Sequence, residues 1–398
     1  MKRIKFLGLI IFFASLTISS QTDKDFNTSV NAFNTSYVFE KKGDYENSID
    51  VIKKEFNENK NIVYETNLRL GWLNYKVGFY KQSMQHYENA IALKPNSIEA
   101  KTGYSLPAYA MGVNDKVIAQ YQKILELDPQ NTSISYNLGS IYYYQNDYKN
   151  ALPYFEKVYS LYPFQYDGLL MFAWTNLKLN KTAEAELLFN KLALRWPNDA
   201  SVLEGLNLLK VDLAKDAELK QKIAKSIELS GKPDYKSAIA VLKQSYSSTS
   251  FELNMLLGWM CNESKLYQES IDYYKICITL NPNSLDPKFG IVSPLFALGN
   301  TNELIEHYKK ILEIDPQNSI ANYRLGYIFY NKKQYQNANI FFDKVVTNYP
   351  SSYDGLLMCA WNNYQLGKKE QAKELFVRVL MLSYNDKSAM DGLELCKS

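Results

Sequence analysis

The chain has 398 residues, 46% apolar and 22% charged, values that exclude a largely disordered protein and allow more than one packed core. Its 45 basic residues nearly balance 42 acidic ones. Three of the basic residues, Lys2, Arg3 and Lys5, stand at the extreme N-terminus, so the rest of the chain carries 42 of each sign. That balance cannot attract a phosphate backbone, and we expect no nucleic-acid partner.

The N-terminal basic residues precede an apolar run, FLGLIIFFASLTI, that is shorter than the ~20 residues a membrane-spanning helix needs. Small residues, Ser19 and Ser20, follow it. This order predicts a secretory signal peptide over residues 1–20, cleaved near Ser20/Gln21, then a short segment over 21–28 and no stable membrane span afterwards. An uncleaved anchor is the alternative. The first cysteine is Cys261, which excludes a lipid-bearing cysteine at the cleavage site. We expect an exported protein, periplasmic or secreted.

Prolines recur along the chain at intervals of 34 residues, in two ladders: Pro95, Pro129, Pro163 and Pro197, then Pro282, Pro316 and Pro350. Between them, small and apolar residues return at steps of three and four, which is the period of a helix, with one interruption in each interval. Each interval therefore predicts two helices joined by a turn and closed by proline.

This pattern resembles the tetratricopeptide repeat (TPR), which places Leu-Gly in its first helix, Ala and an aromatic residue in its second, and Pro at its close. The resemblance covers nearly all of the chain after the signal, in ten repeats that begin near residues 29, 64, 98, 132, 166, 219, 251, 285, 319 and 353. It implies an all-α, right-handed TPR superhelical solenoid of stacked helix-turn-helix units. Glycine allows close helix contact at Gly71, Gly139, Gly258 and Gly326. One aromatic position of the second helix is expected in the core: Tyr87, Tyr121, Phe155, Phe189, Tyr274, Tyr308, Phe342 and Phe376.

The two ladders are copies of one another. Residues 166–174 read YDGLLMFAW and residues 353–361 read YDGLLMCAW, 187 positions later, and the first repeat of each copy matches at an offset of 190. We therefore predict two blocks, residues 29–210 and 211–398, each with five repeats and a capping helix. The absence of Gly and Pro between Gly205 and Gly231 predicts a helical connection between the blocks.

The resemblance also implies that the first helix of each repeat lines a concave groove with its positions 2, 5, 9 and 12. Position 2 carries carboxylates at Glu65, Glu99, Asp167, Glu252, Asp286 and Asp354. The predicted partner-binding residues are Trp72, Tyr75, Tyr109, Tyr136, Tyr143, Asp167, Trp174, Trp259, Phe296, Tyr323, Tyr327, Tyr330, Asp354, Trp361 and Tyr364. The alternative is that these aromatic side chains pack between neighbouring repeats. We expect the four tryptophans to be accessible, because glycine at position 8 marks the helix contact and position 9 turns away from it.

Two prolines, Pro107 and Pro294, fall inside the first helix of the third repeat in each copy, where proline is expected to kink a helix. Either the kink is tolerated after duplication or it opens the groove.

The sequence shows no pairing of nucleophile and base, no metal-binding cluster and no glycine-rich phosphate loop. His86 and His307 fall at one outer-face position of the second helix and are expected to be solvated. The four cysteines, Cys261, Cys277, Cys359 and Cys396, are expected to be small buried hydrophobic residues, with disulfides as the alternative. We predict no enzyme, no cofactor and no metal.

The leading prediction is a non-enzymatic protein–protein interaction scaffold of the bacterial cell envelope, which holds a protein or peptide partner in an aromatic, acidic-edged groove. The groove carries Leu68, Trp72 and Thr102 where some TPR modules use Lys and Asn to bind a peptide's terminal carboxylate, so that ligand class is not expected. The alternatives are a carbohydrate- or peptidoglycan-binding module with a glycan on the tryptophans, and a periplasmic chaperone for unfolded chains.

Overall fold

The computed structural model describes residues 27–58, 63–211, 217–231 and 234–397, and within these ranges the chain forms helices and no β-strand. The predicted signal peptide and its cleavage position lie outside the described residues. The predicted all-α fold of stacked TPR-type helix pairs is confirmed. By contacts the chain divides into two compact units, unit 1 (Met1–Lys123 with Asn322–Ser398) and unit 2 (Ile124–Ala321). That residues 29–210 and 211–398 are domains stays a prediction.

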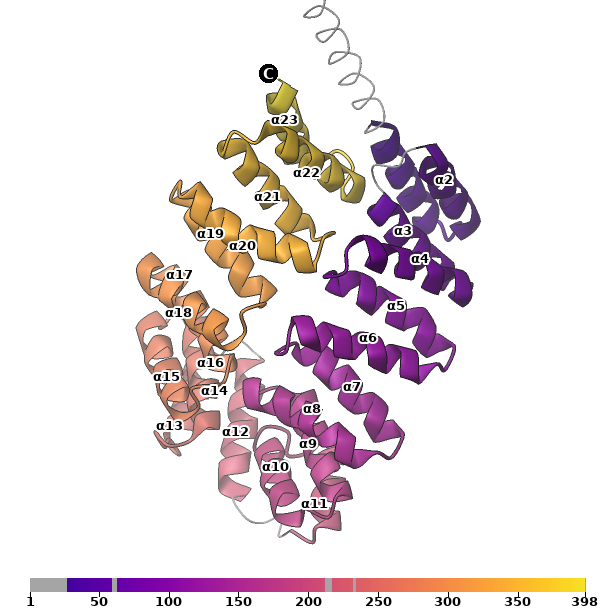
Figure 1. Ribbon diagram of the computed structural model, residues 1–398. Coiled ribbons are helices and arrows are strands. Elements are labelled where there is room, and N and C mark those ends of the chain that lie inside the picture. Colours follow the sequence, from indigo (N-terminus) through magenta and orange to yellow (C-terminus); the bar gives the residue numbers. More distant parts are fainter. Residues whose placement is uncertain (1–26, 59–62, 212–216, 232–233, 398) are drawn as a thin grey trace, which may run out of the picture. The chain divides into compact units, whose positions relative to one another are not determined.

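Unit 1 combines helices from both ends of the chain (Figure 1). Its N-terminal residues 27–41 are helical, and a core that contains Phe33, Ile52 and Leu70 also includes Val377 and Met381. The N-terminal repeats therefore pack against the last repeat of the second copy. The helices are α2 (Tyr45–Glu58), α3 (Val63–Lys76), α4 (Tyr80–Leu93), α5 (Ile98–Ala110), most of α6 (Asn114–Leu127), most of α19 (Ser319–Asn331), α20 (Tyr335–Asn348), α21 (Tyr353–Gln365), α22 (Lys369–Leu382) and α23 (Lys387–Lys397).

Unit 2 holds the middle of the chain. Its cores include one around Phe189 and one around Leu257, and Phe164 and Leu194 of the first copy pack against the second of these. The helices are α7 (Thr132–Tyr144), α8 (Tyr148–Leu161), α9 (Tyr166–Lys178), α10 (Thr182–Arg195), α11 (Ala200–Leu208), α12 (Ala217–Ser230), α13 (Tyr235–Lys243), α14 (Phe251–Glu263), α15 (Tyr267–Leu280), α16 (Asp286–Gly290), α17 (Val292–Ala297) and α18 (Thr301–Ile314).

The duplication is visible in the helix boundaries. Helices α4, α6, α7, α8, α9 and α10 reappear 187 residues later as α15, α18, α19, α20, α21 and α22, with both ends at the matching residue. Helices α11 and α23 follow the fifth repeat in each copy, where the capping helices were predicted.

Local sequence sets where these helices begin and turn. Several helices are capped at their N-terminus by a side chain that accepts a hydrogen bond from the backbone N–H three residues later. Ser97 accepts from Ala100 in this way, and Asn131 accepts from Ile134. The turns inside repeats place one residue in the left-handed region, either glycine or a residue such as Asn146 with φ of 62°.

The second helix of each repeat supplies the predicted aromatic core. Phe155, Phe189, Phe342 and Phe376 are fully buried, and the four tyrosines predicted at the same position are buried too. A Cβ placed at Gly71, Gly139, Gly258 or Gly326 would lie 2.6–3.0 Å from the ring of that aromatic residue. The predicted need for glycine at this contact is confirmed.

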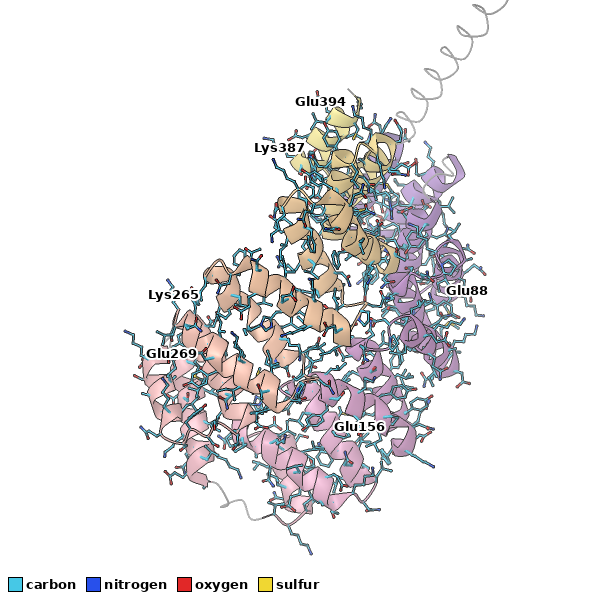
Figure 2. The ribbon with its side chains drawn as sticks, turned by 60° about the vertical axis from the view of Figure 1, so that its left-hand side comes forward. Glu88, Glu156, Lys265, Glu269, Lys387 and Glu394 are labelled. Atoms are coloured by element: carbon cyan, nitrogen blue, oxygen red, sulfur yellow. The ribbon has the colours of Figure 1, made fainter. Side chains whose placement is uncertain are left out.

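The opposite, charged faces of the helices are exposed, as Figure 2 shows for Glu88, Glu156 and Glu269. The expectation of a solvated His307 was wrong, because this side chain is buried, at 5% exposure. His86 is half-buried, and its Nδ1 lies 3.0 Å from Oδ1 of Asn67. The outer-face assignment failed because this position of the second helix still contacts the first helix of its own repeat.

The structure bears on three further expectations. No continuous helix joins the copies, since α11 ends at Leu208, Lys210 has a φ of 55°, and the next described helix starts at Ala217. Pro107 lies inside an unbroken α5, whereas its counterpart segment is divided at Ile291 into α16 and α17. The four cysteines are free and buried, as predicted: Cys261, Cys277, Cys359 and Cys396.

Candidate functional site

The predicted aromatic residues fall into two groups. Four are exposed, namely Phe296 at 76%, Tyr109 at 61%, Tyr327 at 42% and Trp259 at 39%. The half-buried ones are Trp72, Tyr75, Tyr136, Tyr143, Trp174, Tyr323, Tyr330, Trp361 and Tyr364. The exposed pair Tyr109 and Phe296 are counterparts in the two copies, at position 12 of the third repeat.

Trp174 and Trp361, the tryptophans of the repeated nonamer, pack against their own repeat. Their rings meet Phe189 and Phe376 edge-on at centroid distances of 5.2 and 5.0 Å. Each indole N–H donates a 2.9 Å hydrogen bond to a serine of the capping helix, Ser201 in α11 or Ser388 in α23. Position 9 therefore does not turn fully away from the helix contact, because the indole is long enough to reach both the second helix of its repeat and the capping helix.

Two predicted residues come together in unit 2 at a small cavity of about 200 Å³, where Tyr136 and Asp167 share the wall with Gln165. Burial first, and then the Asp167 carboxylate, raise the pKa of Tyr136. The counterparts behave alike, since burial and then Asp354 raise the pKa of Tyr323. Asp167 and Asp354 are both exposed.

The other four carboxylates at position 2 contact distant segments. In unit 1, Glu65 lies 2.8 Å from Nε of Arg378. In unit 2, their counterparts Glu252 and Lys191 lie 3.4 Å apart. Glu99 and Asp286 accept hydrogen bonds from backbone N–H groups of distant segments. Sequence reasoning placed these carboxylates on a groove edge and missed their partners. For Glu65 and Glu252 a signal exists, because the counterpart partners, Arg378 and Lys191, are both basic.

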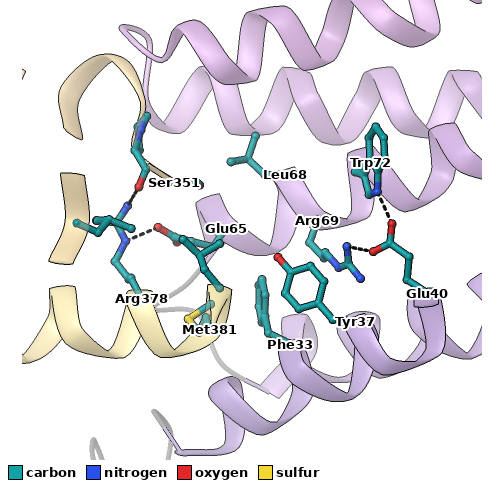
Figure 3. Close-up of a pocket in the computed structure, with 13 residues that line it drawn as sticks. Phe33, Tyr37, Glu40, Glu65, Leu68, Arg69, Trp72, Ser351, Arg378 and Met381 are labelled. Atoms are coloured by element: carbon teal, nitrogen blue, oxygen red, sulfur yellow. Dashed lines mark hydrogen bonds and ion pairs between the residues drawn. The ribbon is translucent and has the colours of Figure 1, made fainter. Parts of the chain in front are cut away.

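Sequence reasoning also missed a pocket in unit 1, which we call the junction pocket (Figure 3). It has a volume of about 360 Å³ and lies between the N-terminal repeats and the last repeat. Its lining residues are Phe33, Tyr37, Glu40, Glu65, Leu68, Arg69, Trp72, Pro350, Ser351, Leu356, Arg378, Met381 and Leu382. Only Trp72 among them was predicted as a site residue.

The polar side chains of the junction pocket are held in pairs. Arg69 forms an ion pair with Glu40, donates from Nε to Ser36 at 3.0 Å, and stacks over the Tyr37 ring with its Cζ 3.9 Å from the centroid. The indole of Trp72 donates to Glu40 at 2.6 Å. The remaining terminal nitrogen of Arg69, Nη2, is buried and has no hydrogen-bond partner in the described part of the chain.

Among the described residues, no group of three or more His, Cys, Asp or Glu side chains could hold a metal ion. Nor do those ranges include a helix with both the length and the apolar character to cross a bilayer. Burial raises the pKa of the cysteine thiols, to about 11 at Cys261 and about 12 at Cys359, so they are poor nucleophiles. What the site offers is a surface and a pocket for binding.

Three segments of the chain match family models described as tetratricopeptide repeat, namely residues 133–164, 251–284 and 321–352. Each begins within two residues of the start of a predicted repeat. These segments are tetratricopeptide repeats, a module that generally mediates protein–protein interactions.

Two curated proteins are similar to this chain. The Homo sapiens "Protein O-mannosyl-transferase TMTC3" is 26% identical over 263 residues, which are 64% of this chain and 26% of that protein. "TPR repeat-containing protein MJ1428" from Methanocaldococcus jannaschii is 31% identical over 106 residues, 26% of this chain and 18% of that protein. The chain thus matches about a quarter or less of each relative's length.

Solved structures of similar fold include a tetratricopeptide repeat protein from Parabacteroides merdae, 17% identical, which covers 68% of this chain and 99% of its own with a TM-score of 0.41. YrrB, titled "a TPR protein with an unusual peptide-binding site", is 14% identical over 48% of this chain and 97% of its own, with a TM-score of 0.39. At these values the likeness concerns the helical-repeat fold only.

Proposed function

We propose that this protein is a non-enzymatic scaffold that binds protein partners through exposed aromatic residues on the first helices of its repeats. The observation that carries the proposal is the pair Tyr109 and Phe296, counterparts 187 residues apart that are 61% and 76% exposed. Large aromatic side chains are costly to leave in water, and they dominate the binding energy when a partner covers them. Both copies present one at the same place.

The proposal is tested by crosslinking capture from native cell envelope with the full chain as bait, followed by mass spectrometry. The double variant Tyr109→Ala/Phe296→Ala should lose the specifically captured proteins, since aromatic anchors each contribute about 2 kcal/mol or more. Phe79→Ala is the matched control, because Phe79 is 54% exposed but begins a second helix. Equal capture by the double variant and the wild type would refute the role of these residues.

We further propose that the protein works outside the cytoplasm, in the periplasm or as a secreted protein. Support comes from the sequence, where Lys2, Arg3 and Lys5 precede a short apolar run and two serines. N-terminal sequencing of the protein from its native envelope should begin near Gln21. A sequence that starts at Met1 would contradict cleavage and favour the anchor.

A further inference from the structure

The duplication supplies a template for what the junction pocket holds, because each of its lining residues has a counterpart in unit 2. Ser351 corresponds to Phe164, Arg69 to Leu256 and Glu40 to Ser230. The backbone is fixed in the same way at both places. The N–H of Ser351 donates to Glu99 at 2.9 Å, and the N–H of Phe164 donates to Asp286 at 2.8 Å. The side chains of Ser351 and Phe164 therefore leave equivalent backbone positions.

In unit 2 a phenyl ring occupies the equivalent place. Phe164 packs against the core cluster that contains Ile223 and Leu256, the counterparts of Phe33 and Arg69. The guanidinium of Arg195 covers the ring, with Cζ 3.7 Å from its centroid. The fold thus accommodates an aromatic ring between the first repeat of one copy and the last repeat of the other.

In unit 1 the equivalent position holds Ser351, which has no ring, and Ser351 lines the cavity of about 360 Å³. Its apolar walls are kept by Phe33, Leu356 and Met381, which favour an apolar occupant. The charges of Glu40 and Arg69 cancel within their ion pair, and Glu65 and Arg378 do the same. An occupant therefore needs no net charge to match the lining.

A polar requirement remains at Arg69. Its side chain is 5% exposed, and its Nη2 has no hydrogen-bond partner among the described residues, so a buried N–H donor is left unsatisfied there. A buried donor without an acceptor is costly, and a ligand oxygen that accepts from it is correspondingly favoured. A ring with a nearby carbonyl or carboxylate oxygen satisfies both the apolar walls and this donor.

We propose that the junction pocket binds a phenylalanine side chain of a partner polypeptide, with an oxygen of that residue's backbone accepting a hydrogen bond from Nη2 of Arg69. The partner thereby supplies in unit 1 the ring that Phe164 supplies in unit 2. The inference rests on the proposed function only in taking the partner to be a polypeptide, and it involves none of the exposed anchors Tyr109 and Phe296.

The test uses the full chain and three small probes, N-acetylphenylalanine, its amide, and N-acetylalanine, followed by saturation-transfer NMR and titration. Both phenyl probes should bind and N-acetylalanine should not. Tighter binding of the acid would assign the oxygen to a terminal carboxylate, and equal binding of acid and amide would assign it to a backbone carbonyl. Failure of both phenyl probes to bind the folded wild type would overturn the proposal, whether or not envelope proteins are captured.

Two variants copy unit 2 into unit 1. Ser351→Phe inserts the missing ring and should weaken phenyl-probe binding at least tenfold, whereas Ser160→Phe, at an exposed serine of α8, should leave it unchanged. If Ser351→Phe does not fold, the decision falls to Glu40→Ser/Arg69→Leu, which reproduces Ser230 and Leu256 and removes the unsatisfied donor. This variant should also weaken binding at least tenfold. Wild-type affinity in the folded variants would refute the assigned pocket.

Discussion

The side-chain carboxylate of Glu99 accepts a 2.9 Å hydrogen bond from the backbone N–H of Ser351, 252 residues away in the chain. The counterparts of these residues make the same bond, with Asp286 accepting from Phe164 at 2.8 Å. Each bond ties the third repeat of one copy to the segment before the fifth repeat of the other. The acceptors lie just ahead of the N-termini of α21 and α9, where the helix dipole favours a negative charge. Burial opposes it and raises the pKa of both carboxyls, to about 6 at Asp286.

We expect Glu99→Ala and Asp286→Ala to lower the free energy of unfolding by about 1–3 kcal/mol each, because each change leaves a backbone N–H without its acceptor. Glu99→Ala also removes an acceptor of the Tyr64 hydroxyl, which lies 2.7 Å away. Urea unfolding followed by circular dichroism measures the loss. Asp354→Ala is the control, since this exposed residue holds the same repeat position and should change stability by no more than about 0.5 kcal/mol. Equal effects at all three positions would contradict the assigned bonds.

The stability of unit 2 should depend on pH through a pair of counterpart residues, Asp128 and Asp315, each 5% exposed. Burial, and then the neighbouring Asp315 carboxylate, raise the pKa of Asp128 to about 6, while Asn131 opposes the shift. The hydroxyl of Tyr162 also faces the pair, and burial followed by Asp315 raises its pKa. Two buried carboxylates cannot both ionise cheaply, so the folded state holds a proton more tightly than the unfolded chain.

The sign follows from that difference. The pKa of Asp128 in the folded state lies above the unfolded value of ~3.9. Its contribution to the free energy of unfolding is therefore fully present below about pH 4 and is lost as the pH rises through about 6. Asp128→Asn should therefore reduce the loss of stability between pH 4 and pH 7 by about 2–3 kcal/mol relative to the wild type. Unfolding free energies of both proteins at the two pH values provide the check, with Asp167→Asn as the exposed control. An unchanged pH dependence in Asp128→Asn would refute the shared proton.

The helices could be predicted from the sequence because the same helix–helix contacts recur in successive repeats. Proline spacing, the glycine positions and the aromatic core position each recur, and each reports packing between neighbouring helices, as between Gly139 and Phe155. The contacts of Glu65 with Arg378 and of Glu99 with Ser351 occur once per copy and join segments far apart in the chain. They depend on how the stack curves over several repeats, which no single repeat encodes.

The site was predicted less well for a related reason. Aromatic residues at one repeat position are equivalent in the sequence pattern but have different surroundings in the structure. At position 9, Trp259 is 39% exposed, whereas Trp174 contacts Phe189 and Ser201. The junction pocket left a signal that only a comparison of the copies reveals, namely that YPFQYDGLLM at residues 162–171 becomes YPSSYDGLLM at 349–358, with Ser351 in place of Phe164.

Gly205, in the capping helix α11, should be less replaceable than Gly139, in α7. A Cβ at Gly205 would lie 2.3 Å from Cζ of Phe189, whereas one at Gly139 would lie 3.0 Å from the ring of Phe155. Gly205→Ala should lower the free energy of unfolding by about 1–3 kcal/mol through overpacking against a fully buried ring. At Gly139, the helical gain of about 0.5–1 kcal/mol from alanine should offset the milder contact. Thermal and urea melts decide, and a more stable Gly205→Ala protein would contradict the packing.

The tryptophans of the repeated nonamer provide the last prediction. Trp174 and Trp361 each contact a buried phenylalanine and donate to a serine of the capping helix, so replacement by alanine should lower the free energy of unfolding by about 2–4 kcal/mol. Trp174→Phe keeps a ring but loses the bond to Ser201, and should lower it by about 0.5–1.5 kcal/mol. Trp259 is 39% exposed and meets Tyr235 at 6.0 Å, so Trp259→Ala should lower it by less than about 1 kcal/mol. Urea melts of the four variants test this order. Equal losses for all three alanine variants would mean that the nonamer tryptophans are surface residues like Trp259. In that case the folded Trp174→Ala and Trp361→Ala proteins should capture less partner than the wild type.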